Sequence, residues 1–136
     1  MLETVRVEQW LYRVLSQDMT LGDMVGGRIY AYVAPQDAPF PFILISHQAG
    51  HDVRGVGPAR VMVSLVYQVK VVGQGGSFAP LQPIADRIDA LLQGASGAVV
   101  DGQVLMCVRE QPVAYVEVDD GVQYRHLGGL YRIIAQ

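Results

Sequence analysis

Charged residues and cysteine are scarce in this chain of 136 residues. Charged side chains make up 17% of it and cysteine occurs once, at Cys107, so the chain can form neither an internal disulfide framework nor a Cys/His zinc motif. Lysine and arginine number 10 and form no basic run, which argues against an electrostatic nucleic-acid footprint. No apolar run approaches the ~20 residues that cross a bilayer, and the N-terminus lacks a signal-peptide core. These absences predict a soluble protein that folds in a reducing cytoplasm.

Hydrophobic residues, in contrast, make up 51% of the chain. A chain of this length is predicted to form one domain, residues 1–136, that buries about two-thirds of its unfolded surface. Because so few charges are available to cover the outside, we expect part of the apolar excess to lie in contacts with other chains.

Helices are predicted in three places. Apolar residues recur at helical spacing over residues 4–16 and again over about 79–93, where two prolines are tolerated only in the first turn. Between them, Thr20 and Asp23 resemble a capping box that opens a short helix, which Gly26–Gly27 would end.

Strands are predicted over most of the remainder. Their ranges are 28–33, about 42–46, 61–72, 99–109, 113–119 and 122–135. Residues 34–39 indicate a proline-punctuated turn, and 49–58 a flexible loop. Asp119-Asp120-Gly121 predicts a hairpin, and Gly128–Gly129 a bulge or a close backbone approach. The order α, α, β, β, β, α, β, β, β predicts an α+β fold, a mostly antiparallel sheet with the N-terminal helix and the helix at about 79–93 on one face.

The candidate chemical groups do not form a recognisable active site. His47 and His51 lie near Asp52, but a zinc site needs three or four converging ligands. The Gly73–Ser77 connection between a strand and a helix has the outline of a phosphate cradle, yet no Gly-Lys-Ser/Thr follows. We therefore predict no enzyme activity and no catalytic, cofactor-binding or metal site.

Several segments together resemble a known family. They are Met24 to Tyr30, Ala34 to Phe42, Ile84 to Ile88 and the strand after Asp119-Asp120-Gly121, in addition to the N-terminal helix. In these features the chain resembles the tail-completion or tail-terminator proteins of long-tailed bacteriophages and related prophage elements. The sharpest match is Gly-Arg-Ile-Tyr followed by the proline-rich Pro-Phe turn.

The resemblance implies a structural virion protein of the tail and neck, made in the host cytoplasm. Such proteins form a ring, typically a hexamer, on the head-proximal end of the tail tube. The ring stops tube polymerisation and joins the tail to the neck or connector, and DNA passes through its lumen without sequence recognition. The net charge of -3 suits that passage, although the 50–58 loop lacks the acidic character usual in the family and carries Arg54.

Assembly contacts are predicted in three segments: the 50–60 loop, the 35–42 turn and the 73–77 connection. The individual residues are Arg28, Tyr30, Pro35, Phe40, Phe42, His51, Arg54, Arg60 and Gly75. The alternatives within the virion are a head-tail adaptor or a tube-like subunit. An alternative of another class is a small ligand-binding α+β domain that uses the 73–77 connection.

Overall fold

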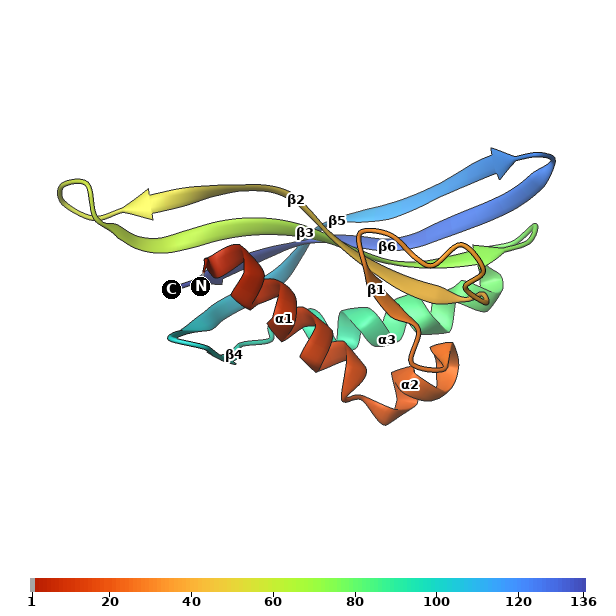
Figure 1. The fold of residues 1–136 in the computed structure, drawn as a ribbon, viewed down its shortest axis with the longest axis horizontal. Helices are drawn as coiled ribbons and strands as arrows, with labels where there is room; N and C mark the ends of the chain where they lie inside the picture. The colour runs from red at the N-terminus through yellow and green to blue at the C-terminus, as the bar shows by residue number, and fades with distance from the viewer. Residues whose placement is uncertain (1) are drawn as a thin grey trace.

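Residues 2–136, which the computed structural model describes, form three α-helices, one 3-10 turn and six strands (Figure 1). The helices are α1 (Glu3–Ser16), α2 (Met19–Val25) and α3 (Gln82–Leu92), and the 3-10 turn η1 (Ala79–Leu81) leads into α3. The strands are β1 (Ile29–Ala31), β2 (Phe42–Arg54), β3 (Arg60–Gln74), β4 (Gly97–Val99), β5 (Gly102–Asp119) and β6 (Val122–Ala135).

The strands form one curled sheet in the order β1-β2-β3-β6-β5-β4. Only β1 and β2 are parallel; the other neighbours are antiparallel. The three helices lie on one face of this sheet (Figure 1). The predicted α+β class, with a mostly antiparallel sheet and helices on one face, is confirmed.

The core lies between the helices and the covered face of the sheet. Its fully buried side chains include Leu11 of α1, Ile88 of α3, Tyr67 of β3 and Ile133 of β6. The hydroxyl of Tyr67 donates to the Thr4 carbonyl oxygen at 2.8 Å, which fixes α1 against the sheet centre. A buried hydroxyl needs such a partner to offset its desolvation.

The predicted helices are present, with one correction at α2. Its N-cap is Asp18, whose carboxylate accepts from the Leu21 amide at 2.9 Å, so the capping box at Thr20 was wrong. The same carboxylate pairs with Arg87 of α3 at 2.6 Å, which lowers its pKa to about 2. Asp18 therefore caps one helix and joins it to another.

The N-terminal strands differ from the prediction. β1 is shorter than residues 28–33 and runs parallel to β2, so residues 32–41 form a loop that crosses the sheet rather than a tight turn. The flexible loop predicted over 49–58 was also wrong, because β2 continues to Arg54 and pairs with β3. That part of β2 is exposed on both faces and follows a register shift after His47, which removes the alternation that would have indicated a strand.

The C-terminal strands are divided differently from the prediction. The strand predicted over 99–109 was wrong at its start, because β4 ends at Val99, residues 100 and 101 form a turn and β5 begins at Gly102. Residues 111 and 112 do not separate two strands but lie within β5, where a register shift between Arg109 and Gln111 accommodates them. The Asp-Gly hairpin is confirmed, with positive φ angles of 51° at Asp120 and 78° at Gly121. Gly128 makes the predicted close approach: a Cβ added there would lie 2.1 Å from the Val69 carbonyl oxygen.

Candidate assembly surfaces

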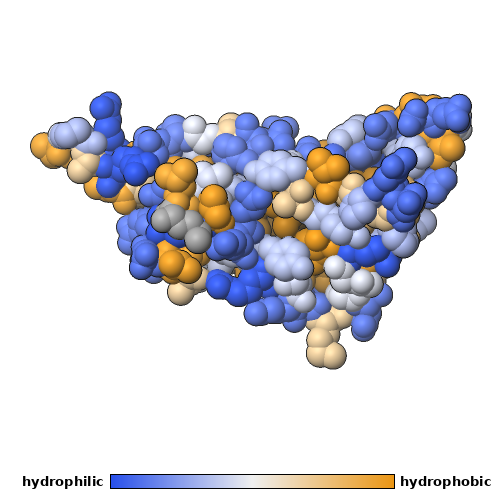
Figure 2. Space-filling view, viewed as in Figure 1, coloured by the Kyte–Doolittle hydropathy of each residue, from blue (hydrophilic) through white to orange (hydrophobic). Residues whose placement is uncertain are grey.

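Two hairpins extend past the helices in opposite directions (Figure 1). The β2–β3 arm, residues 48–62, projects at the end where α1 begins and β6 ends. The β5–β6 arm, residues 113–126, projects at the other end. In the space-filling view both arms stand out from the body as wings (Figure 2). Each subunit thus has two different exposed ends.

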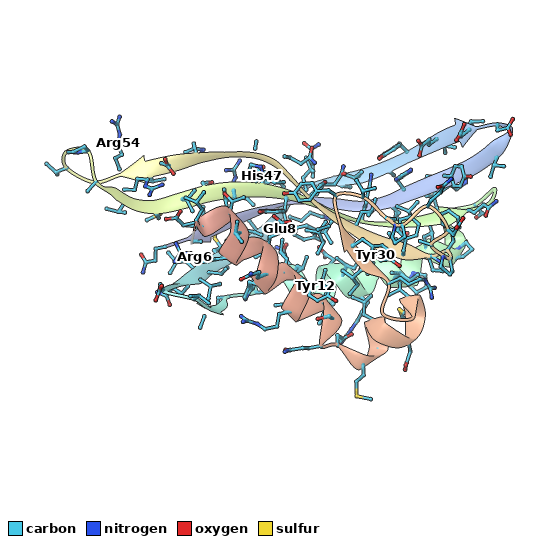
Figure 3. All side chains as sticks on the ribbon, viewed as in Figure 1. Arg6, Glu8, Tyr12, Tyr30, His47 and Arg54 are labelled. Atoms are coloured by element: carbon cyan, nitrogen blue, oxygen red, sulfur yellow. The ribbon has the colours of Figure 1, made fainter. Side chains whose placement is uncertain are left out.

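The β2–β3 arm ends in a basic tip. Residues 54–60 contain two arginines and no acidic residue. Arg54 stands at the far end of the arm, clear of the body (Figure 3). Arg60 lies 3.8 Å from Asp52 and 3.9 Å from Glu3, so it is partly neutralised within its own chain. Between the two arginines, Val56 is fully exposed, at 108% of its reference area.

The β5–β6 arm ends in an acidic tip. Residues 115–124 contain Glu117, Asp119 and Asp120 and no lysine or arginine. Val116 and Val118 alternate with these carboxylates and are exposed, because neither face of the arm is covered. The two arms therefore differ in charge and share exposed valine.

A side-chain cluster on the uncovered face of the sheet stiffens the base of the β5–β6 arm. The Lys70 ammonium donates to the Tyr115 hydroxyl at 2.6 Å, and the Tyr115 ring stacks on His126 with centroids 4.3 Å apart. His126 Nε2 lies 3.0 Å from the Glu117 carboxylate. Burial lowers the pKa of His126 more than Glu117 raises it. These groups are engaged with one another, which suits a structural role.

The loop groove is a hollow of about 520 Å³ on the uncovered face, between the 32–41 loop and the β5–β6 arm. Its floor is aromatic: Phe40 packs against Phe42 at 5.2 Å and against Tyr124 at 5.5 Å, centroid to centroid. Its rim includes the carboxylates of Glu117 and Asp119. The groove is apolar at the bottom and negative at the edge.

The loop that forms one wall of this groove is held at both ends. The Tyr32 amide donates to the Ile45 carbonyl oxygen at 2.8 Å, and the Tyr32 hydroxyl donates to the Glu8 carboxylate of α1 at 3.0 Å. At the other end the Arg28 guanidinium donates to the Pro41 carbonyl oxygen at 3.0 Å. The wall is therefore preformed by the fold.

The assembly residues predicted from the sequence fall into three groups. Pro35, Phe40 and Phe42 line the loop groove, and His51, Arg54 and Arg60 lie on the β2–β3 arm. Arg28, Tyr30 and Gly75 act inside the subunit: Arg28 holds the loop, Tyr30 packs on Phe42, and the Gly75 carbonyl oxygen accepts from Arg125.

The β5–β6 hairpin was predicted from the sequence, but not as an assembly surface. Its signal was the alternation of valine with carboxylates over residues 116–119, which was interpreted only as a strand before a turn. An interior strand of a sandwich would carry apolar residues on at least one covered face, whereas here the valines face no helix.

Chemical sites are not supported by the geometry. Within residues 2–136 no three His, Cys, Asp or Glu side chains converge as metal ligands, and His47 instead packs edge-on against Tyr67. Burial raises the pKa of Cys107 to about 12, which makes it a poor nucleophile. At the 73–77 connection, the Ser77 hydroxyl already accepts from the Ala79 amide at 3.0 Å, so that amide is not free for a phosphate. Over the described residues, none of the helices is both long and apolar enough to span a membrane.

Comparisons with known proteins identify the family. The family described as "Tail completion protein gp17" matches residues 9–133. A solved structure, a chain of the "Virion of native gene transfer agent (GTA) particle", is similar with a TM-score of 0.76 and 17% identity, covering 93% of this chain and 92% of that one. No curated protein sequence matches. The family match spans nearly the whole chain, and the chain belongs to the tail completion protein gp17 family, as a structural protein of the virion tail.

Proposed function

We propose that this protein is a tail terminator: its copies form a closed ring, with six subunits expected, on the head-proximal end of the tail tube. The ring stops tube polymerisation and joins the tail to the neck or connector. The observation that carries the proposal is the pair of unlike arms at opposite ends of one subunit (Figure 1). A contact between unlike surfaces is heterologous, and it closes into a ring when the rotation between neighbours divides a full turn.

The role we propose is non-enzymatic, and it lets DNA pass through the ring without reading its sequence. A net charge of -3 and the lack of a basic run support weak attraction to phosphates. The mutual engagement of Lys70, Tyr115, His126 and Glu117 supports a structural rather than catalytic use of the uncovered face.

Mass photometry and negative-stain imaging of the purified protein test the ring. We expect one closed species that does not lengthen as the protein concentration rises. Added to the tube protein of the same virion, the ring should shorten the tubes and cap one end of them. Long tubes formed by the purified protein alone would refute the terminator role and support a tube-like subunit.

A second measurement separates the terminator from a head-tail adaptor. A terminator should bind tube ends in the absence of the connector, whereas an adaptor should bind the connector and leave tube length unchanged. A nucleotide panel tests the ligand-binding alternative, because a ligand that binds only the folded state raises the melting temperature. A terminator that binds no nucleotide should keep the same melting temperature across the panel.

A further inference from the structure

We infer that the tip of the β2–β3 arm of one copy of this chain inserts into the loop groove of a second copy. The inference rests on the proposed ring, and it specifies which surfaces close it. The insertion places Val56 on the aromatic floor and Arg54 at the acidic rim.

The tip of the β2–β3 arm, residues 54–60, exposes an apolar side chain that packs against nothing in the described part of its own chain. Val56 is fully exposed between two glycines, Gly55 and Gly57, so no neighbouring side chain covers it. Two antiparallel strands hold the tip away from the body, because β2 and β3 stay paired out to Arg54 and Arg60. An apolar residue held at the end of a paired hairpin is presented to a neighbour at little cost in conformational entropy.

The groove is built as a receptor of matching chemistry. Phe40, Phe42 and Tyr124 offer apolar area for one valine, and Asp119 offers a carboxylate for an arginine. Glu117 adds negative charge to the same rim, although His126 already contacts one of its oxygens. Burial lowers the pKa of His126 on the same wall, which favours its neutral form at neutral pH. Opposite charges across an interface fix its register and speed the encounter.

The two surfaces cannot meet within one subunit. The β2–β3 arm and the β5–β6 arm, which forms the other wall of the groove, project in opposite directions from the body (Figure 1). The tip of one copy must therefore reach the groove of another, and each copy gives one tip and receives one. Repetition of this contact yields a ring when it closes.

Single substitutions at exposed positions test the contact without disturbing the core. Val56→Asp should weaken subunit association at least about tenfold, because it places a carboxylate on an aromatic floor with an acidic rim. Its control is Met19→Asp on α2, where the side chain is 84% exposed on the helical side of the molecule. Association is measured by sedimentation over a concentration series, and folding by thermal unfolding.

Charge reversal tests whether Arg54 of one copy pairs with Asp119 of the next. Arg54→Glu and Asp119→Arg should each weaken the ring, because each places two like charges across the contact. The double variant should recover part of the loss, because it restores a pair of opposite charges with the two signs exchanged. Asp23→Arg, an exposed reversal on α2, is the control and should assemble like the original chain.

Engineered cysteines give a direct readout. In a Val56→Cys and Gln36→Cys double variant, oxidation should link each tip to the next groove and produce a ladder of covalent oligomers that ends at the closed ring. Met19→Cys with Gln36→Cys is the control and should give no ladder. The native thiol does not interfere, because Cys107 is fully buried.

The outcomes separate this contact from the ring itself. If Val56→Asp assembles like Met19→Asp, or if rings form without cysteine cross-links, the contact is refuted and the terminator ring stands. If the unmodified protein stays monomeric at every concentration, the proposed ring fails and the contact fails with it.

Discussion

Replacing Gly128 with alanine tests how closely the two central strands, β3 and β6, are packed. Gly128 lies opposite Lys70, and an added Cβ would lie 2.1 Å from the Val69 carbonyl oxygen and 2.6 Å from the Lys70 Cα. Both are backbone atoms, so no side-chain rotation relieves the clash. Since a carbon–oxygen contact is ordinarily about 3.3 Å, the strands must separate by about 1 Å.

That separation strains the hydrogen-bond ladder at the sheet centre. Overpacking costs about 1–3 kcal/mol and each weakened hydrogen bond about 1 kcal/mol, so Gly128→Ala should lower the free energy of unfolding by about 3 kcal/mol. The melting temperature should fall by about 10 °C, and the urea midpoint by about 1.5 M at a slope of about 2 kcal/mol/M.

Gly22→Ala is the matched control. A Cβ at Gly22, within α2, meets nothing within 4 Å, and alanine favours a helix over glycine by about 1 kcal/mol. The control should therefore be neutral or stabilising in the same urea titration. A Gly128→Ala protein that unfolds within about 0.5 kcal/mol of the original chain would show that β3 and β6 are not packed this closely.

Three further predictions concern titratable groups. Asp18→Asn should cost about 1–2 kcal/mol at neutral pH, after allowance for the partial exposure of Arg87. Because the folded pKa of Asp18 is lowered to about 2, the original chain should lose this stabilisation as the pH falls from about 4 to 2. If urea titrations show the same loss of stability in the Asp18→Asn variant, the pairing of Asp18 with Arg87 is refuted. The pKa of His126 is lowered by burial, so stability should fall as the pH drops below about 6.5, and His126→Phe should flatten that slope in melting curves. A thiol reagent should label Cys107 only in denaturant, and rapid labelling of the native protein would contradict its burial.

The sequence predicted the elements that pack a regular apolar face on the core. α1 and α3 place apolar residues at helical spacing, and β3 alternates them, because one face of each element contacts the core. The other face of β3 is also buried along most of its length. The α+β class followed from the order of these elements. The parallel pairing of β1 with β2 could not be predicted, because it depends on the path of the 32–41 loop across the sheet, which is set by long-range contacts such as Tyr32 with Ile45 and Glu8.

Two of the errors in the strand assignment fall on the arms and their bases. The outer part of β2 was read as a loop, and β5 was divided at Pro112, because neither segment alternates cleanly between a buried and an exposed face. A strand with neither face covered by its own chain needs no regular alternation of apolar and polar residues for the subunit to fold. If a neighbouring copy covers these strands, contacts with that copy determine which residue types occur there. The exposed side chains of Val56, Val116 and Val118 are then explained by burial between subunits. The irregular hydrophobic pattern of the two arms then indicates the segments that contact other copies.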